Sequence, residues 1–340
     1  MDLGFGLITC ERYPGDPRSD QDLYRDALEL AAEAERLGFD SVWVSEHHFV
    51  DDAYLPSLLP MCAALAARTS RMAIGTSLLL APLYEPVRLA EDAAVVDLIS
   101  AGRLVLGLGL GWRREEFEAF GVSLSERGPR MEETVAILRQ AWGGRLVTGG
   151  ELVRYPGVAV TPKPARPGGP PVWIGASSET AVRRAGRIAD GFLGTEVTPE
   201  EYGKQAMWIR EEREQAGREA DPFTFGLYMS TFAWPGDDAW DLVRDHHNYV
   251  MWKYVDMEEA RGSVGPPTKP PPPGPGEEES LRRTILVGRP DEVAERILAY
   301  REAAGEDLTF VARLYWPGMD SSLQREVMAI FAEEVVPVLR

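Results

Sequence analysis

Short apolar segments alternate with amphipathic ones along most of this chain. The apolar run from Leu3 to Thr9 predicts a buried strand, and apolar residues at helical spacing follow it from Leu23 to Leu37. Gly38 stands where a glycine commonly ends a helix, and Ser41 to Val44 again favour a strand. Six further strands are predicted, at 72–80, 103–108, 170–175, 191–194, 223–231 and 308–314. Helical patterns between the strands indicate βαβ units, and about eight such units favour a closed (β/α)8 TIM barrel over an open sheet.

Two segments interrupt this α/β pattern. Residues 146–161 carry glycines and alternating apolar positions, which predict an inserted hairpin. Residues 262–276 are nearly all proline and glycine, so we expect neither a helix nor a central strand there, but a disordered Pro-rich loop or a lid over the barrel mouth. We therefore expect one domain over residues 1–340, with insertions at about 143–165 and 258–283.

Composition narrows the classes of partner. The net charge of −18 argues against nucleic acid or an anionic membrane. No apolar run approaches the roughly 20 residues that span a bilayer, and the first residues lack a secretory leader, so we expect a cytoplasmic protein. Cys10 and Cys62 show no spacing typical of disulfides or zinc sites, which fits a reducing compartment.

Glu46, His47 and His48 directly follow the predicted strand at 41–44, where (β/α) barrels place their chemistry. They suit a metal site, an acid–base or cofactor contact, or simply a polar strand end. Adjacent histidines on an extended chain point to opposite sides, which argues against one shared metal ion. Imidazole titrates near neutral pH, so we favour proton transfer or cofactor contact and expect no metal site.

A glycine-rich segment, Gly107 to Trp112, follows the strand at 103–108. It does not match the dinucleotide-binding fingerprint, because Trp112 stands where the third glycine belongs. We expect its glycines, Gly109 among them, to let the backbone approach a bound ring system or to turn the chain at the barrel mouth.

Gly175 to Thr180 joins a predicted strand to a helix. Its free amides and the hydroxyls of Ser177 and Ser178 suit an anion at a helix N-terminus. An ordinary helix cap uses the same residue types, and the sequence leaves both interpretations open.

Together these segments resemble the bacterial luciferase-like family of flavin-dependent monooxygenases. The resemblance runs in order from residue 1 to about residue 194 and is weaker at 287–293. It rests on residues 38–49, 74–77, 86–92, 100–103, 130–133 and 171–178. It implies an eight-stranded barrel that binds reduced FMN at its C-terminal mouth and inserts one atom of O2 into an organic substrate.

The resemblance also implies roles for individual residues. His47 matches the active-site histidine beside the flavin, with Glu46 and His48 as its neighbours. Ser77 and Leu78 fall where the family often has a non-prolyl cis peptide beside the flavin ring. The residues expected to contact the cofactor are Ser77, Leu78, Gly109, Trp112, Arg130, Gly175, Ser177 and Ser178, the serine pair on the phosphate.

One departure from the family concerns the phosphate. Luciferases proper have an arginine aligned with Leu110, so Arg113 or Arg130 would have to take its place here. The departure argues against light emission but not against flavin binding.

Three other functions compete with an FMN-dependent monooxygenase. Deazaflavin-dependent relatives commonly carry Asp-His where this chain has Glu46-His47-His48, so the sequence favours FMN; a deazaflavin would make the protein a hydride-transfer dehydrogenase or reductase. A non-catalytic flavin-binding protein would not need this cluster. A metal-dependent hydrolase on the same fold is the remaining alternative.

The sequence also suggests partners. No NAD(P)H-binding fingerprint is visible, so we expect a separate flavin reductase. Relatives are usually homo-oligomers, most simply a dimer, and the helix around 58–62 would supply an apolar surface unless it faces the barrel. The substrate is expected to be a small organic molecule. Four aromatic residues either line a pocket over the flavin or serve as packing: Trp112, Tyr228, Trp252 and Tyr254.

Overall fold

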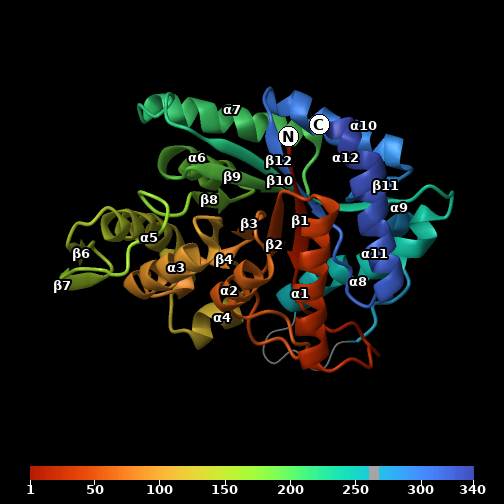
Figure 1. Ribbon diagram of the computed structural model, residues 1–340, viewed down its shortest axis with the longest axis horizontal. Coiled ribbons are helices and arrows are strands. Elements are labelled where there is room, and N and C mark those ends of the chain that lie inside the picture. Colours follow the sequence, from red (N-terminus) through yellow and green to blue (C-terminus); the bar gives the residue numbers. More distant parts are fainter. Residues whose placement is uncertain (260–267) are drawn as a thin grey trace.

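Eight parallel strands close into a ring with helices around it, as the computed structural model shows for residues 1–259 and 268–340 (Figure 1). The barrel strands are β1 (Asp2–Ile8), β2 (Ser41–Val44), β3 (Ala73–Thr76), β5 (Leu104–Gly109), β8 (Val172–Gly175), β9 (Gly191–Thr195), β10 (Thr224–Ala233) and β12 (Leu308–Arg313). Each pairs with the next in this order, and β12 pairs with β1 to close the ring. The predicted TIM barrel is therefore confirmed.

Helices surround the strands, and all but the one at 275–283 occur where the apolar spacing predicts them. They are α1 (Asp20–Leu37), α2 (Leu58–Arg68), α3 (Pro86–Ser100), α4 (Arg114–Ala119), α5 (Arg127–Trp142), α6 (Glu179–Ile188), α7 (Pro199–Gln215), α8 (Ala239–Glu259), α9 (Pro275–Arg283), α10 (Pro290–Ala304), α11 (Ser321–Ile330) and α12 (Val336–Leu339). Helix α1 shows how the sequence sets the ends of a helix. Ser19 and Asp22 form a reciprocal capping box at its start, and Gly38 ends it with a left-handed φ of 89°.

Two expectations about strands need correction. The predicted strand at 72–80 is broken into β3 and β4 (Leu79–Leu80), and the Ser77–Leu78 peptide bond between them is cis, as the resemblance implied. A further strand, β11 (Ile285–Gly288), was not predicted; it pairs with the last four residues of β10, outside the ring. The hairpin is confirmed as β6 (Val147–Gly149) and β7 (Arg154–Val158), which project beside α5 in Figure 1.

The Pro-rich segment is more ordered at its end than its composition suggests. Helix α9 begins at Pro275, inside the stretch where we expected no helix. Proline is compatible with the first turn of a helix because its missing N–H has no partner there, and the glutamates that follow suit the N-terminal dipole. Residues 268–274 have neither helix nor strand, and the rest of the expected lid, 260–267, lies outside the described residues.

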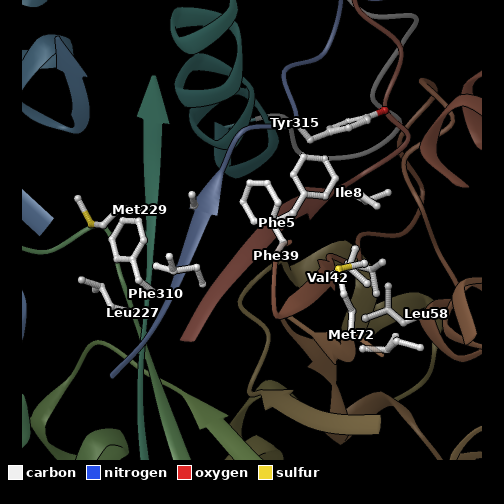
Figure 2. Close-up of a cluster of buried hydrophobic side chains, with 14 of the residues drawn as sticks. Phe5, Ile8, Phe39, Val42, Leu58, Met72, Leu227, Met229, Phe310 and Tyr315 are labelled. Carbon is white, nitrogen blue, oxygen red and sulfur yellow. The ribbon is translucent and has the colours of Figure 1, made fainter. Parts of the chain in front are cut away.

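Large side chains fill the barrel below its mouth. Trp43 of β2 and Trp173 of β8 meet inside the ring with their centroids 5.3 Å apart. A Cβ at Gly75 would lie 2.2 Å from the Trp43 ring, so the glycine makes room for the indole. Outside the ring, Phe5 and Phe39 pack between the strands and helices (Figure 2). The filled interior leaves space for a ligand only at the end of the barrel.

Helix α2 does not offer the apolar surface considered for oligomerisation. The side chains concerned, Leu58, Leu59, Met61 and Cys62, are all buried in the chain's own core. The alternative that they face the barrel is therefore confirmed. Nearby exposed apolar residues lie instead on α3, at Val95, Leu98 and Ile99. Among the helices described here, none is long and apolar enough to cross a membrane.

Candidate active site

A cavity of about 580 Å³ opens at the C-terminal ends of the barrel strands. Its wall is formed by the segments that follow β2, β3, β5, β8 and β9, together with side chains from β10 and α8. Nine of the residues singled out in the sequence line it: Glu46, His47, Ser77, Leu78, Gly109, Trp112, Gly175, Ser177 and Ser178. His48 and Arg130 do not line it. The barrel thus gathers most of the predicted site from segments far apart in the sequence.

His47 is held by a carboxylate that sequence reasoning missed. Glu116 on α4 is completely buried, and its Oε1 lies 3.0 Å from His47 Nδ1 and 2.9 Å from the backbone nitrogen of His48. Because a carboxylate accepts, Nδ1 of His47 is the donor. Neutral His47 therefore has its lone pair on Nε2, which is the arrangement a general base needs. Glu116 is 69 positions from His47, and no local pattern in the sequence links them.

Three aromatic rings surround the His47 imidazole edge-on. The centroids of Tyr54, Tyr254 and Trp112 lie 5.1, 5.6 and 5.8 Å from that of His47. The hydroxyls of Tyr54 and Tyr254 are 3.3 Å apart, so they form a hydrogen bond across the mouth. Of the four aromatic residues considered from the sequence, Trp112, Tyr228 and Tyr254 line the cavity, whereas Trp252 does not line it and packs near Tyr249.

Glu46 and His48 form a second pair beside His47. Nε2 of His48 lies 2.8 Å from Glu46 Oε1, and the hydroxyl of Tyr84 donates to Oε2 at 3.1 Å. Burial raises the pKa of Glu46, although both hydrogen bonds act to lower it. His48 itself packs against Phe120, with their centroids 4.9 Å apart. It therefore touches the cavity only through Glu46.

One end of the cavity suits an anion. Ser177 and Ser178 line it just before α6, and Ser178 is the N-cap residue but makes no side-chain capping hydrogen bond. The side chain of Arg127 also lines this cavity and donates to the carbonyl of Gly111 at 2.9 Å. The anion-site interpretation thus gains a cation in the same cavity as the helix N-terminus.

The two arginines considered for the cofactor phosphate lie elsewhere. Arg130 pairs with Glu126, the residue that directly precedes its helix α5, at 3.1 Å. Arg113 is buried and donates to the backbone carbonyl of His48. Arg127, three residues before Arg130 on the same helix, is the arginine that lines the cavity.

The glycines near the mouth make room for protein rather than for a ligand. A Cβ at Gly109 would lie 2.9 Å from Cβ of Leu78, and one at Gly175 would lie 2.2 Å from its Cδ1. Gly109 thus makes room for Leu78 and also lines the cavity, so the expectation that it lets the backbone approach a bound ring stays a prediction. The second expectation, a turn at the mouth, fits Gly111, whose φ is 73°.

The wall formed by β1, β9, β10 and β12 holds a charged network that was not predicted. Arg313, completely buried, donates to the hydroxyl of Tyr228 at 3.1 Å and lies 3.4 Å from Glu11. Lys253 of α8 donates to Glu11 at 2.7 Å and also to Asp52. Burial acts to raise the pKa of Glu11, but the two cations outweigh it and lower the pKa. The network attaches α8 to the barrel mouth.

Glu196 follows β9 directly and lines the cavity. Its Oε1 accepts from Ser230 at 2.9 Å and from the Tyr228 hydroxyl at 3.3 Å. Burial raises the pKa of Glu196, while the charge of Arg313 acts to lower it. An acidic residue directly after a predicted barrel strand is a signal that sequence reasoning missed.

A TIM barrel with a buried histidine–carboxylate pair and an anion site in one cavity has the features of a cofactor-dependent barrel enzyme. The family model described as luciferase-like monooxygenase matches residues 3–307, and the chain belongs to that family. This confirms the resemblance seen in the sequence.

Individual relatives differ in cofactor. The chain is 32% identical to the F420-dependent glucose-6-phosphate dehydrogenase of Nakamurella multipartita, over 93% of this chain and 92% of the relative. It is 26% identical to the oxygenase component of flavin-dependent trigonelline monooxygenase from Acinetobacter baylyi, over 98% and 97%. Monooxygenase RslO1 from Streptomyces bottropensis has a similar structure, with a TM-score of 0.83, 25% identity and 99% of each chain covered. The protein is therefore an oxidoreductase of a family with flavin-dependent and F420-dependent members.

Proposed function

We propose that this chain is the oxygenase component of a two-component monooxygenase, which uses reduced FMN and O2 to oxidise a small organic substrate. The observation that carries the proposal is a single cavity of about 580 Å³ with the His47–Glu116 pair in its wall and an anion site at Ser177, Ser178 and Arg127. The monooxygenase relatives support it.

The lining residues fit a cofactor with a compact anionic tail. Arg127 and the serine pair would hold the phosphate of FMN beside the N-terminus of α6. Among the described residues that line the cavity, Arg127 is the one cationic side chain. A single cation suits the one phosphate of FMN better than the long tail of a deazaflavin coenzyme with its several carboxylates.

The chain's own residues handle the protons. When bound, reduced FMN supplies the electrons that activate O2. Nε2 of His47 is free to exchange a proton with a substrate oxygen, and the negative charge of Glu116 stabilises the imidazolium that results. Tyr54, Trp112 and Tyr254 surround the imidazole and exclude water from it.

A second candidate function is hydride transfer with a deazaflavin. The full-length similarity to an F420-dependent dehydrogenase favours it. In that reaction His47 would take the proton of a substrate hydroxyl while the hydride leaves the adjacent carbon. The same pair of residues serves both reactions, so the cofactor decides between them.

The deciding experiment identifies the cofactor. Protein purified without added cofactor is examined by absorption spectrum and mass, and is then titrated with reduced FMN under anaerobic conditions and separately with F420. We expect tighter binding of reduced FMN and O2 consumption that depends on substrate. Exclusive binding of F420 would favour the dehydrogenase, and binding without any turnover would favour a storage protein.

We further propose that a separate reductase supplies the reduced flavin, by analogy with the relative that is one component of such a system. The purified chain should then oxidise NADH no faster in the presence of FMN than in its absence. Rapid NADH oxidation by the chain alone would contradict this proposal.

A further inference from the structure

Glu196 lines the cavity, but the proton transfers proposed for His47 do not involve it. Only its Oε1 is engaged, by the hydroxyls of Ser230 and Tyr228. Among residues 1–259 and 268–340, its Oε2 has no hydrogen-bond partner and the side chain has no ion pair closer than 4 Å. The carboxylate lies at the end of a barrel strand, and its second oxygen is available to a ligand.

Glu196 stands apart from the ion pairs on this side of the cavity. Glu11, Asp52 and Glu196 are carboxylates, whereas Lys253 and Arg313 are the cations. Lys253 is shared between Glu11 and Asp52, and Arg313 contacts Glu11. Among the described residues, Glu196 is thus the one of these three acidic side chains that no cation contacts, although the charge of Arg313 acts on it from a distance.

Aromatic rings accompany this carboxylate. The hydroxyl of Tyr228 donates to Glu196. Tyr228, Tyr254 and Trp112 all line the cavity. The faces of such rings attract cations, and a carboxylate beside aromatic rings is a common means of recognising an ammonium group. An anionic group at the same place would meet the charge of Glu196. The net charge of −18 also favours the approach of cations over anions.

We propose that Glu196 recognises a protonated amine on the substrate and thereby sets the substrate class of this enzyme. Oε2 accepts a hydrogen bond from the ammonium group, and the ring of Tyr228 or Tyr254 covers its side. The inference rests on the proposed function insofar as it assumes that the cavity binds an organic substrate beside a cofactor.

The test compares two probes of similar size in the full chain. Benzylamine, protonated at neutral pH, and benzyl alcohol, neutral, are titrated by calorimetry into the wild type, E196Q and the control E200Q. Glu200 is exposed on α7, so E200Q makes the same change in net charge away from the cavity. Gln retains an oxygen for Ser230 and Tyr228, so E196Q should keep the local structure.

We expect the wild type and E200Q to bind benzylamine at least tenfold more tightly than benzyl alcohol, and E196Q to lose this preference. Equal binding of the two probes by the wild type would overturn the inference without recourse to any variant. An unchanged preference in E196Q would also overturn it.

Titration with FMN and F420, in parallel, separates this inference from the proposed function. Normal cofactor binding with no preference for the amine refutes the inference and leaves the proposed function standing. A preference for the amine that depends on Glu196, in a chain that binds neither cofactor, supports the inference and refutes the proposed function.

Discussion

The pair formed by His47 and Glu116 allows a sharp test of the proposed chemistry. Replacing Glu116 by glutamine removes the negative charge but keeps one oxygen. Both His47 Nδ1 and the backbone N–H of His48 bond to the same carboxylate oxygen, so the amide oxygen of glutamine can accept both hydrogen bonds. The variant therefore isolates the effect of charge from that of geometry.

The size of the effect follows from the burial of Glu116. Its side chain has no exposed surface, so solvent does not screen its charge. A hydrogen bond to a charged group contributes about 1.5–3 kcal/mol. With 1.36 kcal/mol for each factor of ten, E116Q should lower kcat by about 10- to 150-fold. Cofactor affinity should change little, because Glu116 does not line the cavity.

The same substitution should also destabilise the fold. Oε2 of Glu116 is buried and has no hydrogen-bond partner among the described residues. The amide group of glutamine would bring donors to this place without acceptors, at a cost of about 1–3 kcal/mol. Thermal unfolding of E116Q must therefore be measured first, so that kcat is compared at a temperature where both proteins are folded.

The assay combines kinetics with a spectroscopic readout. Substrate-dependent O2 uptake with reduced FMN, or anaerobic F420 reduction if that cofactor binds, gives kcat. The control is E118Q, which changes an exposed glutamate on the same helix. The chain has four histidines, so the ring nitrogens of His47 can be assigned by NMR with one variant, H47Q. A wild-type rate in E116Q, or a neutral His47 with its proton on Nε2, would refute the reasoning.

Three further outcomes are expected. R127A should weaken FMN binding by about 10- to 150-fold, from the loss of about 1.5–3 kcal/mol, whereas R130A should leave it unchanged, as fluorescence titration would show. Burial acts to raise the pKa of Glu35, but hydrogen bonds from three successive backbone amides outweigh this effect and lower the pKa to about 2. The ionised carboxylate therefore stabilises the fold fully above pH 4.5, and this contribution is lost as the pH falls towards 2. Urea unfolding should accordingly show E35Q less stable than wild type by about 1–2 kcal/mol at pH 7, with a difference that shrinks as the pH falls through about 2. G107A should lower the free energy of unfolding by about 1–3 kcal/mol or more, because its Cβ would lie 2.0 Å from a backbone oxygen, whereas G276A, which meets no atom within 4 Å, should not.

The sequence predicted the barrel because each unit carries its own signal. A strand buried on both sides needs a continuous apolar run, and a helix on the barrel needs one apolar face, so both patterns can be read locally. The same holds for the groups directly after the strands, such as Glu46 and His47, since the carboxyl ends of all barrel strands meet at one mouth. Glu196 satisfies this rule as well and was overlooked.

The parts of the structure that could not be predicted depend on contacts between segments far apart in the sequence. Glu116 meets His47 only because the loop after β5 folds back over the end of β2, and a six-residue helix has no pattern that shows which of its acids is buried. Lys253 meets Glu11 across 242 positions for the same reason. β11 and α9 escaped notice because the prolines before them dominate the local composition. Periodicity reports which face of an element is buried, not which partner it meets.

Proton handling and electron supply have separate structural sources in this protein. The His47–Glu116 pair is fixed by the closure of the barrel and would serve an oxygenase and a dehydrogenase equally. In the proposed function the electrons come from the cofactor, and the charge of Arg127 in the cavity wall would select its tail. In the further inference a substrate amine would meet Oε2 of Glu196, which has no hydrogen-bond partner among the described residues. Cofactor binding, substrate selectivity and turnover thus depend on different side chains. R127A should alter cofactor affinity, E196Q should alter the preference between the two probes, and E116Q should alter kcat. A variant that changed all three together would mean that the residues act as one structural unit.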